Sequence, residues 1–253
     1  VGAGTDALTV AAGFTNALTV NMDATNINTV DASAYTKVLT VATTAEILND
    51  ATHVLKGGTA SDILSITADS GAAATVSGIV DIENINVVGD AGTFAWTAHD
   101  NNADTASTIT VDATSMSGGT KAATINMVAE NDAAVIVRGG AGDDTITMSA
   151  SALVDNISGN AGNDTIKFAS ANLTATDIVD GGAGTDVLMA TDEVAIVDAD
   201  FTLVENVETL TGSTAAMAVN ATIGGEAAQA GISTVTFVDT AAATDSLTVA
   251  AGF

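Results

Sequence analysis

The chain contains no cysteine and no proline, and it is poor in aromatic and basic residues. Without cysteine, neither a disulfide framework nor a thiolate zinc site can form. Aromatic residues account for 3% of the 253 residues, although hydrophobic residues account for 47%. Large rings usually supply much of the buried area of a compact core. We therefore expect a thin core of layered alanine, valine, isoleucine and leucine side chains.

The charge is strongly one-sided, with 31 acidic residues against five lysines and arginines and a formal net charge of −26. Such a chain has no basic patch to neutralise phosphates, so we do not expect a nucleic-acid partner. Many of the acids lie in glycine turns, which indicates that bound divalent cations relieve their repulsion. The alternative is a solubilising or salt-adapted surface. No apolar run reaches the length of a membrane span, so membrane insertion is not expected.

The sequence opens with a repeat of about ten residues. Four alternating units begin at Thr5, Thr15, Thr25 and Thr36. Each unit joins a short strand to a few turn residues, so two units are expected to form one coil of a flattened solenoid. Residues 244–253 repeat residues 5–14 with one change, which suggests one period of a tandem array. The absence of an initiating methionine and a signal peptide suggests a piece of a longer protein.

Short strands are expected throughout, and no segment has a clean amphipathic helical face. The predicted strands are Ile63–Thr67, Ile85–Val88, Thr108–Val111, Val135–Val137, Thr165–Phe168 and Val235–Val238. The best helix candidate, Thr44–Leu55, has Leu48 and Leu55 at helical spacing but no consistent apolar face. The single Trp96 and Tyr35 are expected to pack at coil ends or contact surfaces, because they are too few to form a sugar-stacking platform.

Glycine-rich turns occupy the middle of the chain. The pattern Gly-Gly-x-Gly-x-Asp-x-(large apolar)-x matches completely at residues 139–147 and 181–189, and it matches at 159–167 with Asn160 as the second residue. The aspartates of these turns are Asp144, Asp164 and Asp186. Their spacing of about one coil predicts that the three turns stack along one edge of the solenoid. The large apolar residues that follow should point into the core.

Three further segments match this pattern less well. Residues 57–65 have Ala60 in place of the third glycine, and residues 1–9 match only from the second position onward. At residues 118–126 the aspartate is replaced by Ala123, so this coil should stack without an ion ligand of its own. The acidic segment 100–104 resembles half of an EF-hand loop, but the required glycine and distal glutamate are missing. A solvated turn is the preferred interpretation there, and a place for Asp104 along the stacked edge is the alternative.

The turn chemistry points to calcium. Glycines allow sharp turns that expose carbonyl oxygens, and Ca²⁺ prefers six or more oxygen ligands. One turn cannot supply them all, so an ion should lie between two stacked turns. The alternative is a plain polar hairpin turn. The predicted metal-site residues are Gly139, Gly140, Gly142, Asp143, Asp144, Gly159, Asn160, Gly162, Asp164, Gly181, Gly182, Gly184, Asp186, Gly57, Asp62 and Asp6.

In these turns the chain resembles the RTX (repeats-in-toxin) proteins of Gram-negative bacteria. The remainder, including the segments 82–85 and 204–207, resembles RTX-type surface-layer proteins and large surface adhesins. The resemblance implies an all-β, elongated, right-handed parallel β-roll of about 20 residues per coil with several Ca²⁺ ions. It also implies type I secretion, folding on meeting extracellular calcium, and assembly at the cell surface.

One continuous solenoid is expected over residues 1–253. Its predicted parts are ten-residue repeats at 1–56, a first calcium-turn region at 57–117, the densest stack at 118–190, and motif-poor strands at 191–253.

No enzyme signature is present. The only histidines, His53 and His99, do not form a His-Glu-x-x-His pair, and there is no Gly-x-Ser-x-Gly elbow or Walker A loop. The adjacent acids Asp143 and Asp144 belong to a calcium turn, which disfavours a glycosidase pair. A self-assembling surface lattice or filament is the leading hypothesis, with copies of the chain and cell-surface polysaccharide as expected partners. The alternatives are a repeat module of a giant adhesin and the secretion domain of an RTX exoenzyme.

Overall fold

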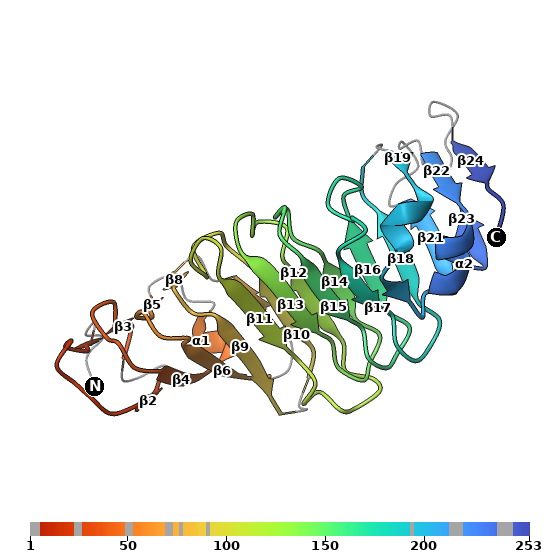
Figure 1. Cartoon of the computed structure of the whole chain (residues 1–253). Helices are drawn as coiled ribbons and strands as arrows, with labels where there is room; N and C mark the ends of the chain where they lie inside the picture. Colours follow the sequence, from red (N-terminus) through yellow and green to blue (C-terminus); the bar gives the residue numbers. More distant parts are fainter. Residues whose placement is uncertain are drawn as a thin grey trace.

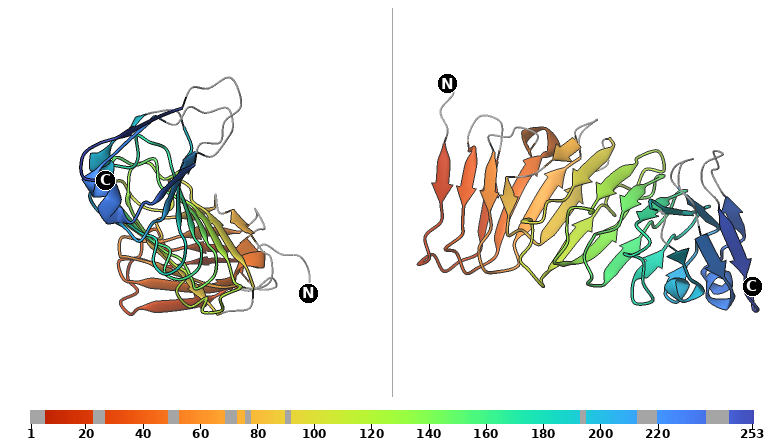
Figure 2. Two further views of the ribbon diagram at one scale, coloured as in Figure 1. Left: turned by 90° about the vertical axis from the view of Figure 1, so that its right-hand side faces the viewer. Right: turned by 90° about the horizontal axis from the view of Figure 1, so that it is seen from above.

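The structure is a computed structural model that describes residues 6–22, 27–48, 53–68, 73–75, 78–89, 92–192, 195–212, 220–236 and 245–253. The chain winds through about nine coils of about 22 residues each, which stack along one long axis (Figures 1 and 2). Every strand pairing in these segments is parallel. The predicted all-β parallel solenoid is therefore confirmed, and its coils are slightly longer than the expected 20 residues.

Two long sheets form the body of the solenoid. The nine-stranded sheet contains β2 (Leu18–Asn21), β4 (Leu39–Thr44), β6 (Ile63–Thr67), β9 (Asn84–Val88), β11 (Thr108–Asp112), β13 (Ala134–Arg138), β15 (Asp155–Ser158), β17 (Ile178–Asp180) and β20 (Val204–Glu205). The eight-stranded sheet contains β7 (Ala73–Thr75), β10 (Phe94–Thr97), β12 (Ala123–Asn126), β14 (Thr145–Thr147), β16 (Thr165–Phe168), β18 (Val187–Ala190), β21 (Thr209–Gly212) and β23 (Thr234–Thr236).

A third, shorter sheet is present towards each end. One contains β1 (Ala7–Thr9), β3 (Thr29–Asp31), β5 (Val54–Lys56) and β8 (Ile79–Val80), and the other contains β19 (Ala195–Ile196), β22 (Asn220–Ile223) and β24 (Ser246–Val249). The ten-residue repeats place β1 and β3 in one sheet and β2 and β4 in the next. Two units therefore form one coil, as the sequence predicts.

The alternation of side chains along each strand builds the core. In β13, Val135 and Val137 are fully buried, while Ile136 between them is partly exposed. The predicted inward residues Ile146, Ile166 and Leu188 lie in register on neighbouring strands and have no exposed surface. Each such side chain contributes about 1.5–3 kcal/mol by burial. The apolar row therefore aligns the turns that precede it.

Helical structure is minor in the described part of the chain. It comprises α1 (Ala45–Leu48), the 3₁₀-helix η1 (Asp198–Phe201) and α2 (Gly225–Ala230). The Asp198 carboxylate accepts hydrogen bonds from the N–H groups of Gly224 and Ala227 at 2.6 and 3.0 Å, which fixes the start of α2. None of these helices has the length and apolarity needed to cross a membrane.

The strand predictions are confirmed within one or two residues, although residues 237–238 of the last one lie outside the described segments. Within the helix candidate Thr44–Leu55, α1 forms and β5 begins at Val54, while residues 49–52 lie outside the described residues. Trp96 and Tyr35 have no exposed surface, so the expectation that they form contact surfaces is wrong; Trp96 lies within β10, and Tyr35 packs in the turn between β3 and β4.

Stacked turns approach each other so closely that some positions tolerate only glycine. Gly184 has φ +152°, and a Cβ atom there would collide with the carbonyl oxygen of Gly162 in the preceding coil. The Gly184→Ala substitution should therefore destabilise the fold by about 2 kcal/mol or more, through backbone strain and separation of the coils. Gly225→Ala is the matched control, because a Cβ atom at Gly225 meets no atom within 4 Å. Thermal melting in calcium measures both effects, and equal melting temperatures for the two variants would contradict this close packing.

Candidate calcium-binding turns

The three best sequence matches lie at one edge of the solenoid. The turns 139–144, 159–164 and 181–186 each connect a strand of the nine-stranded sheet to the next strand of the eight-stranded sheet. We call this edge the glycine edge. The predicted stacking of Asp144, Asp164 and Asp186 is confirmed, because the strands that follow them pair in register.

A ladder of hydrogen bonds joins these aspartates from coil to coil. The backbone N–H of Asp144 donates to Oδ1 of Asp164 at 2.7 Å, and the N–H of Asp164 donates to Oδ1 of Asp186 at 2.7 Å. At the start of the ladder, the N–H of Ala123 donates to Oδ1 of Asp144 at 2.6 Å. Ala123, which stands in place of the aspartate at residues 118–126, thus donates its N–H to the ladder but adds no carboxylate, as predicted for that coil.

The second carboxylate oxygen distinguishes the coils. Oδ2 of Asp144 accepts the N–H of Gly140 at 2.6 Å. In the next two coils the second turn residue has positive φ, +73° at Asn160 and +100° at Gly182. Asparagine tolerates this left-handed conformation better than most residues, which explains its presence in place of glycine. Oδ2 of Asp164 and Oδ2 of Asp186 are both buried and have no hydrogen-bond partner.

Backbone carbonyls approach the same places. A Cβ atom on Gly159 would collide with Oδ2 of Asp164 and with the carbonyl oxygen of Gly181 from the next coil. Gly139 has the same relation to Asp144 and to the carbonyl of Gly159. The absent glycine side chains therefore leave spaces lined by a carboxylate oxygen and a carbonyl oxygen from two successive coils. Unpartnered buried oxygens in such a space suit Ca²⁺, and these residues would hold it.

Burial also changes the acidity of the ladder. It raises the pKa of Asp144 to about 6 and that of Asp164 to about 7, and neighbouring carboxylates add to both shifts. The pKa of Asp186 is raised for the same reason, with the charge of Glu208 contributing. The two ion pairs in the described segments, Lys56–Asp31 and Arg138–Asp112, do not involve these aspartates. A cation is the counter-charge that would keep the ladder ionised.

The fifth position of the turn lies outside this ladder. Asp143 is exposed, and its Oδ1 accepts the N–H of Asn163 at 2.7 Å, while Oδ1 of Asn163 accepts the N–H of Thr185 at 3.0 Å. This outer series connects the same three coils. Among the predicted metal-site residues, Asp143 is therefore placed on the solvent side, and it contributes charge rather than a buried oxygen.

The turn at residues 57–62 has the same local geometry but lies elsewhere. Oδ1 of Asp62 accepts the N–H of Leu39 at 2.7 Å and Oδ2 accepts that of Gly58 at 2.5 Å. A Cβ atom on Gly57 would again collide with the aspartate and with a carbonyl of the next coil, that of Asp81. However, this turn leads into β6 of the nine-stranded sheet. It therefore lies on the opposite edge, where turns enter that sheet.

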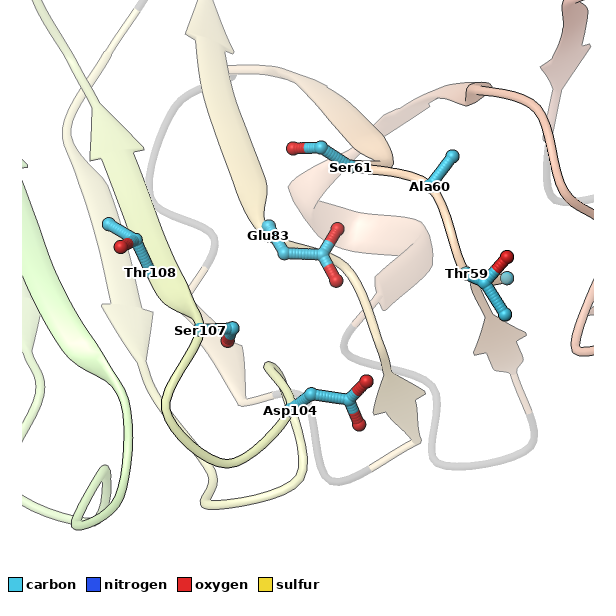
Figure 3. A pocket seen from close by; sticks show the side chains of 8 residues that line it. Thr59, Ala60, Ser61, Glu83, Asp104, Ser107 and Thr108 are labelled. Carbon is cyan, nitrogen blue, oxygen red and sulfur yellow. The ribbon is translucent and has the colours of Figure 1, made fainter.

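An open pocket of about 350 Å³ borders the 57–62 turn. Figure 3 shows the carboxylates of Glu83 and Asp104 turned to the same side of this pocket, which residues 59–61 line from the neighbouring turn. Burial raises the pKa of Asp81 and of Glu83, and Asp104 adds to the shift at Asp81. Asp104 lies in the turn between β10 and β11, on the edge opposite Asp144, so the alternative that placed it along the edge of Asp144, Asp164 and Asp186 is wrong.

Sequence reasoning missed two glutamates that end the ladders. Oε2 of Glu83 accepts the N–H of Asp62 at 2.7 Å, and Oε2 of Glu208 accepts that of Asp186 at 2.7 Å. The counterpart of Glu83 is thus Glu208 and not the exposed Glu205. The spacing of about one coil from the preceding aspartate was the available signal.

The remaining predicted site is at the beginning of the chain. Asp6 is exposed, and its backbone carbonyl accepts the N–H groups of Asn28 and Thr29. Residues 2 and 4 of that match lie outside the described residues. Asp6 as a metal ligand stays a prediction.

The family described as RTX calcium-binding nonapeptide repeat matches the chain in four copies, at residues 134–147, 149–167 and 175–191. The chain carries RTX repeats. RTX repeats bind Ca²⁺ in their turns, and the matched residues contain the turns 139–144, 159–164 and 181–186, which we call the RTX stack. No curated protein and no solved structure matches the chain.

Removing one charge from the RTX stack tests its role. Asp164→Asn keeps an oxygen that can accept the N–H of Asp144 but removes the negative charge. We expect the calcium concentration at half-folding to rise about tenfold or more, because Ca²⁺ affinity depends on ligand charge. The fold in chelator should not be weakened, since a buried charge is lost. Circular dichroism during calcium titration measures both, with Asp112→Asn on β11 as the control. An unshifted midpoint for Asp164→Asn would contradict the ligand assignment.

Protons should compete with calcium in the RTX stack. The raised pKa values of Asp144 and Asp164 mean that the calcium-free fold binds protons that the unfolded chain, with aspartate near 3.8, releases. In chelator, stability should therefore be greatest near pH 4 and fall as the pH rises through 6 and 7. In calcium the pH dependence reverses. The calcium concentration at half-folding should be about tenfold higher at pH 6 than at pH 8. A midpoint independent of pH would argue against these carboxylates as ligands.

Proposed function

We propose that this protein is a non-enzymatic, calcium-dependent structural module that assembles end to end with copies of itself on the bacterial surface. The observation that carries the proposal is the relation between two nearly identical strands. β1 and β24 belong to the repeated decapeptide, and each is the outermost strand of its sheet in the described structure. Figure 2 places them at opposite ends of the solenoid.

The two copies of this strand use opposite edges for pairing. In β1 the backbone N–H and C=O groups of the even-numbered residues face the next coil. The N–H of Val10 donates to the carbonyl of Asp31, and the carbonyl of Asp6 accepts from the N–H of Asn28. At the other end, Ala250 N–H donates to the Ile223 carbonyl. Ala250 is the counterpart of Ala11, so β24 uses the alternate set of positions. The free edge of β24 therefore presents the groups that β1 uses to bind β3.

The exposed fractions of the side chains agree with this pairing. Val10 is 5% exposed, whereas its counterpart Val249 is 58% exposed. Leu247 and Phe253 are also exposed at this end, and Phe14 is exposed at the other. A strand edge with exposed apolar side chains favours pairing with a further strand, from a second copy or from a continuation of the same chain. Continuation of the solenoid by a second copy would bury Val249 as Val10 is buried.

Calcium and location support the same proposal. Proteins with RTX repeats are typically secreted by type I secretion. Calcium modules that act outside cells bind in the range of about 10⁻⁴–10⁻³ M. We propose secretion in the unfolded state, folding in extracellular calcium and attachment at the surface, with cell-surface polysaccharide as the anchor. The strand relation also favours the second candidate, a tandem module of a giant adhesin, in which the continuation belongs to the same chain.

Electron microscopy of the purified chain tests the assembly. We expect filaments or sheets in about 10 mM calcium, above the range of extracellular modules, and none in chelator. Val249→Lys should raise the concentration needed for assembly about tenfold or more, because it places a charge on the free edge. Val88→Lys, at an exposed valine in the middle of the nine-stranded sheet, is the matched control. Folded but separate rods at all protein concentrations would contradict self-assembly and support the adhesin module.

A further inference from the structure

A second group of carboxylates lies on the opposite edge, outside the residues that match the RTX family. Asp100 lies in the turn between β10 and β11, and Glu130 and Asp132 lie in the turn between β12 and β13. One carboxylate oxygen from each of the three residues lies within 4.8 Å of the others. We propose that these three residues bind an additional calcium ion that joins two consecutive coils.

The two turns are held together independently of any ion. Ala106 N–H donates to the Asp132 carbonyl at 2.8 Å, and Ala134 N–H donates to the Ser107 carbonyl at 3.0 Å. Thr105 Oγ1 donates to Oδ2 of Asp132 at 2.6 Å. The backbone therefore sets the distance between Asp100 and the other two carboxylates. The acids are brought together by the fold and do not meet by chance on a mobile surface.

Unpartnered oxygens point to a missing ligand. Glu130 has no exposed surface, and its Oε1 accepts the N–H groups of Ala133 and Asp132 at 2.9 and 3.2 Å. Its other oxygen, Oε2, is buried without a hydrogen-bond partner. Oδ1 of Asp100 and Oδ1 of Asp132 are buried and unpartnered as well. Buried carboxylate oxygens are normally hydrogen-bonded or bound to a metal, so three in one place need an explanation.

The chemistry of the group selects the ion. The ligands are carboxylates from flexible side chains, and the chain has no cysteine. Oxygen-only sites suit hard cations, and the irregular arrangement across two turns suits Ca²⁺ better than the strict octahedron of Mg²⁺. Neither ion pair in the described segments includes these residues. Burial and the charges of Asp132 and Asp100 raise the pKa of Glu130, so a proton is the competing ligand.

The ion would support the coil that lacks a ligand on the other edge. β12 begins at Ala123, the residue that replaces the turn aspartate, and the turn with Glu130 and Asp132 follows β12 directly. An ion at Asp100, Glu130 and Asp132 would therefore connect the coil of β12 with the coil of β10 on the opposite edge. Calcium would then stabilise the solenoid before the RTX stack begins.

Counting bound calcium tests this site. The whole chain is saturated in about 10 mM calcium, and the bound ions are counted by native mass spectrometry and equilibrium dialysis. Glu130→Gln keeps the size of the side chain and an acceptor for the two N–H groups but removes the charge. We expect the loss of one ion per chain, with the ions of the RTX stack retained. Glu205→Gln, at an exposed glutamate, is the matched control and should lose none.

If Glu130→Gln prevents folding because Glu130 is buried, Asp132→Asn provides a second test. Asp132 is only partly buried, and asparagine can still accept the hydrogen bond from Thr105. It should also lose one ion. Equal calcium counts in the wild type and in a folded Glu130→Gln or Asp132→Asn variant would overturn the proposal and leave a protonated carboxyl cluster as the explanation.

Discussion

The hydrogen bond from a backbone N–H to the carboxylate of the next coil is the interaction on which this solenoid depends. It fixes Asp144, Asp164 and Asp186 one behind another in the turns before neighbouring strands. Neighbouring strands lie about 4.8 Å apart, so the same bonds that align the coils also stack buried negative charges. Like charges at this distance repel strongly where water is excluded. Alignment and the need for a cation therefore arise from one arrangement.

The glutamates show how the ladders end. Glu208 follows a turn that is shorter than the glycine turns, because β20 ends at Glu205 and β21 begins at Thr209. Asn206 and Asp81, each two residues before the terminal glutamate, both have φ +54°. A short turn lacks the backbone to bring an aspartate to the preceding coil, and the additional methylene of glutamate makes up the distance. Both ladders thus end in the same way on opposite edges.

The parts of the structure that depend on local pattern could be predicted from the sequence. Alternation identified the strands, and the regular spacing of Asp144, Asp164 and Asp186 identified their shared edge. The edge of Asp62 could not be predicted, because coil length varies: Asn84 pairs with Thr110, whereas Val135 pairs with Asp155. The six additional residues of the longer coil change which edge of the solenoid the preceding turns occupy. The cluster of Asp100 and Glu130 combines two dissimilar turns, so no repeat pattern reveals it.

In the assembly that we propose, calcium would act through the folding of the coils. Each coil of a solenoid contacts only its neighbours, so an ion between Asp144 and Asp164 acts directly on two coils. β1 and β24 lie several coils from that position and present backbone groups and apolar side chains at their free edges. These edges exist only when the coils behind them are stacked. In the proposed assembly, loss of the ions between Asp144 and Asp164 would therefore remove the edges that pair with the next copy.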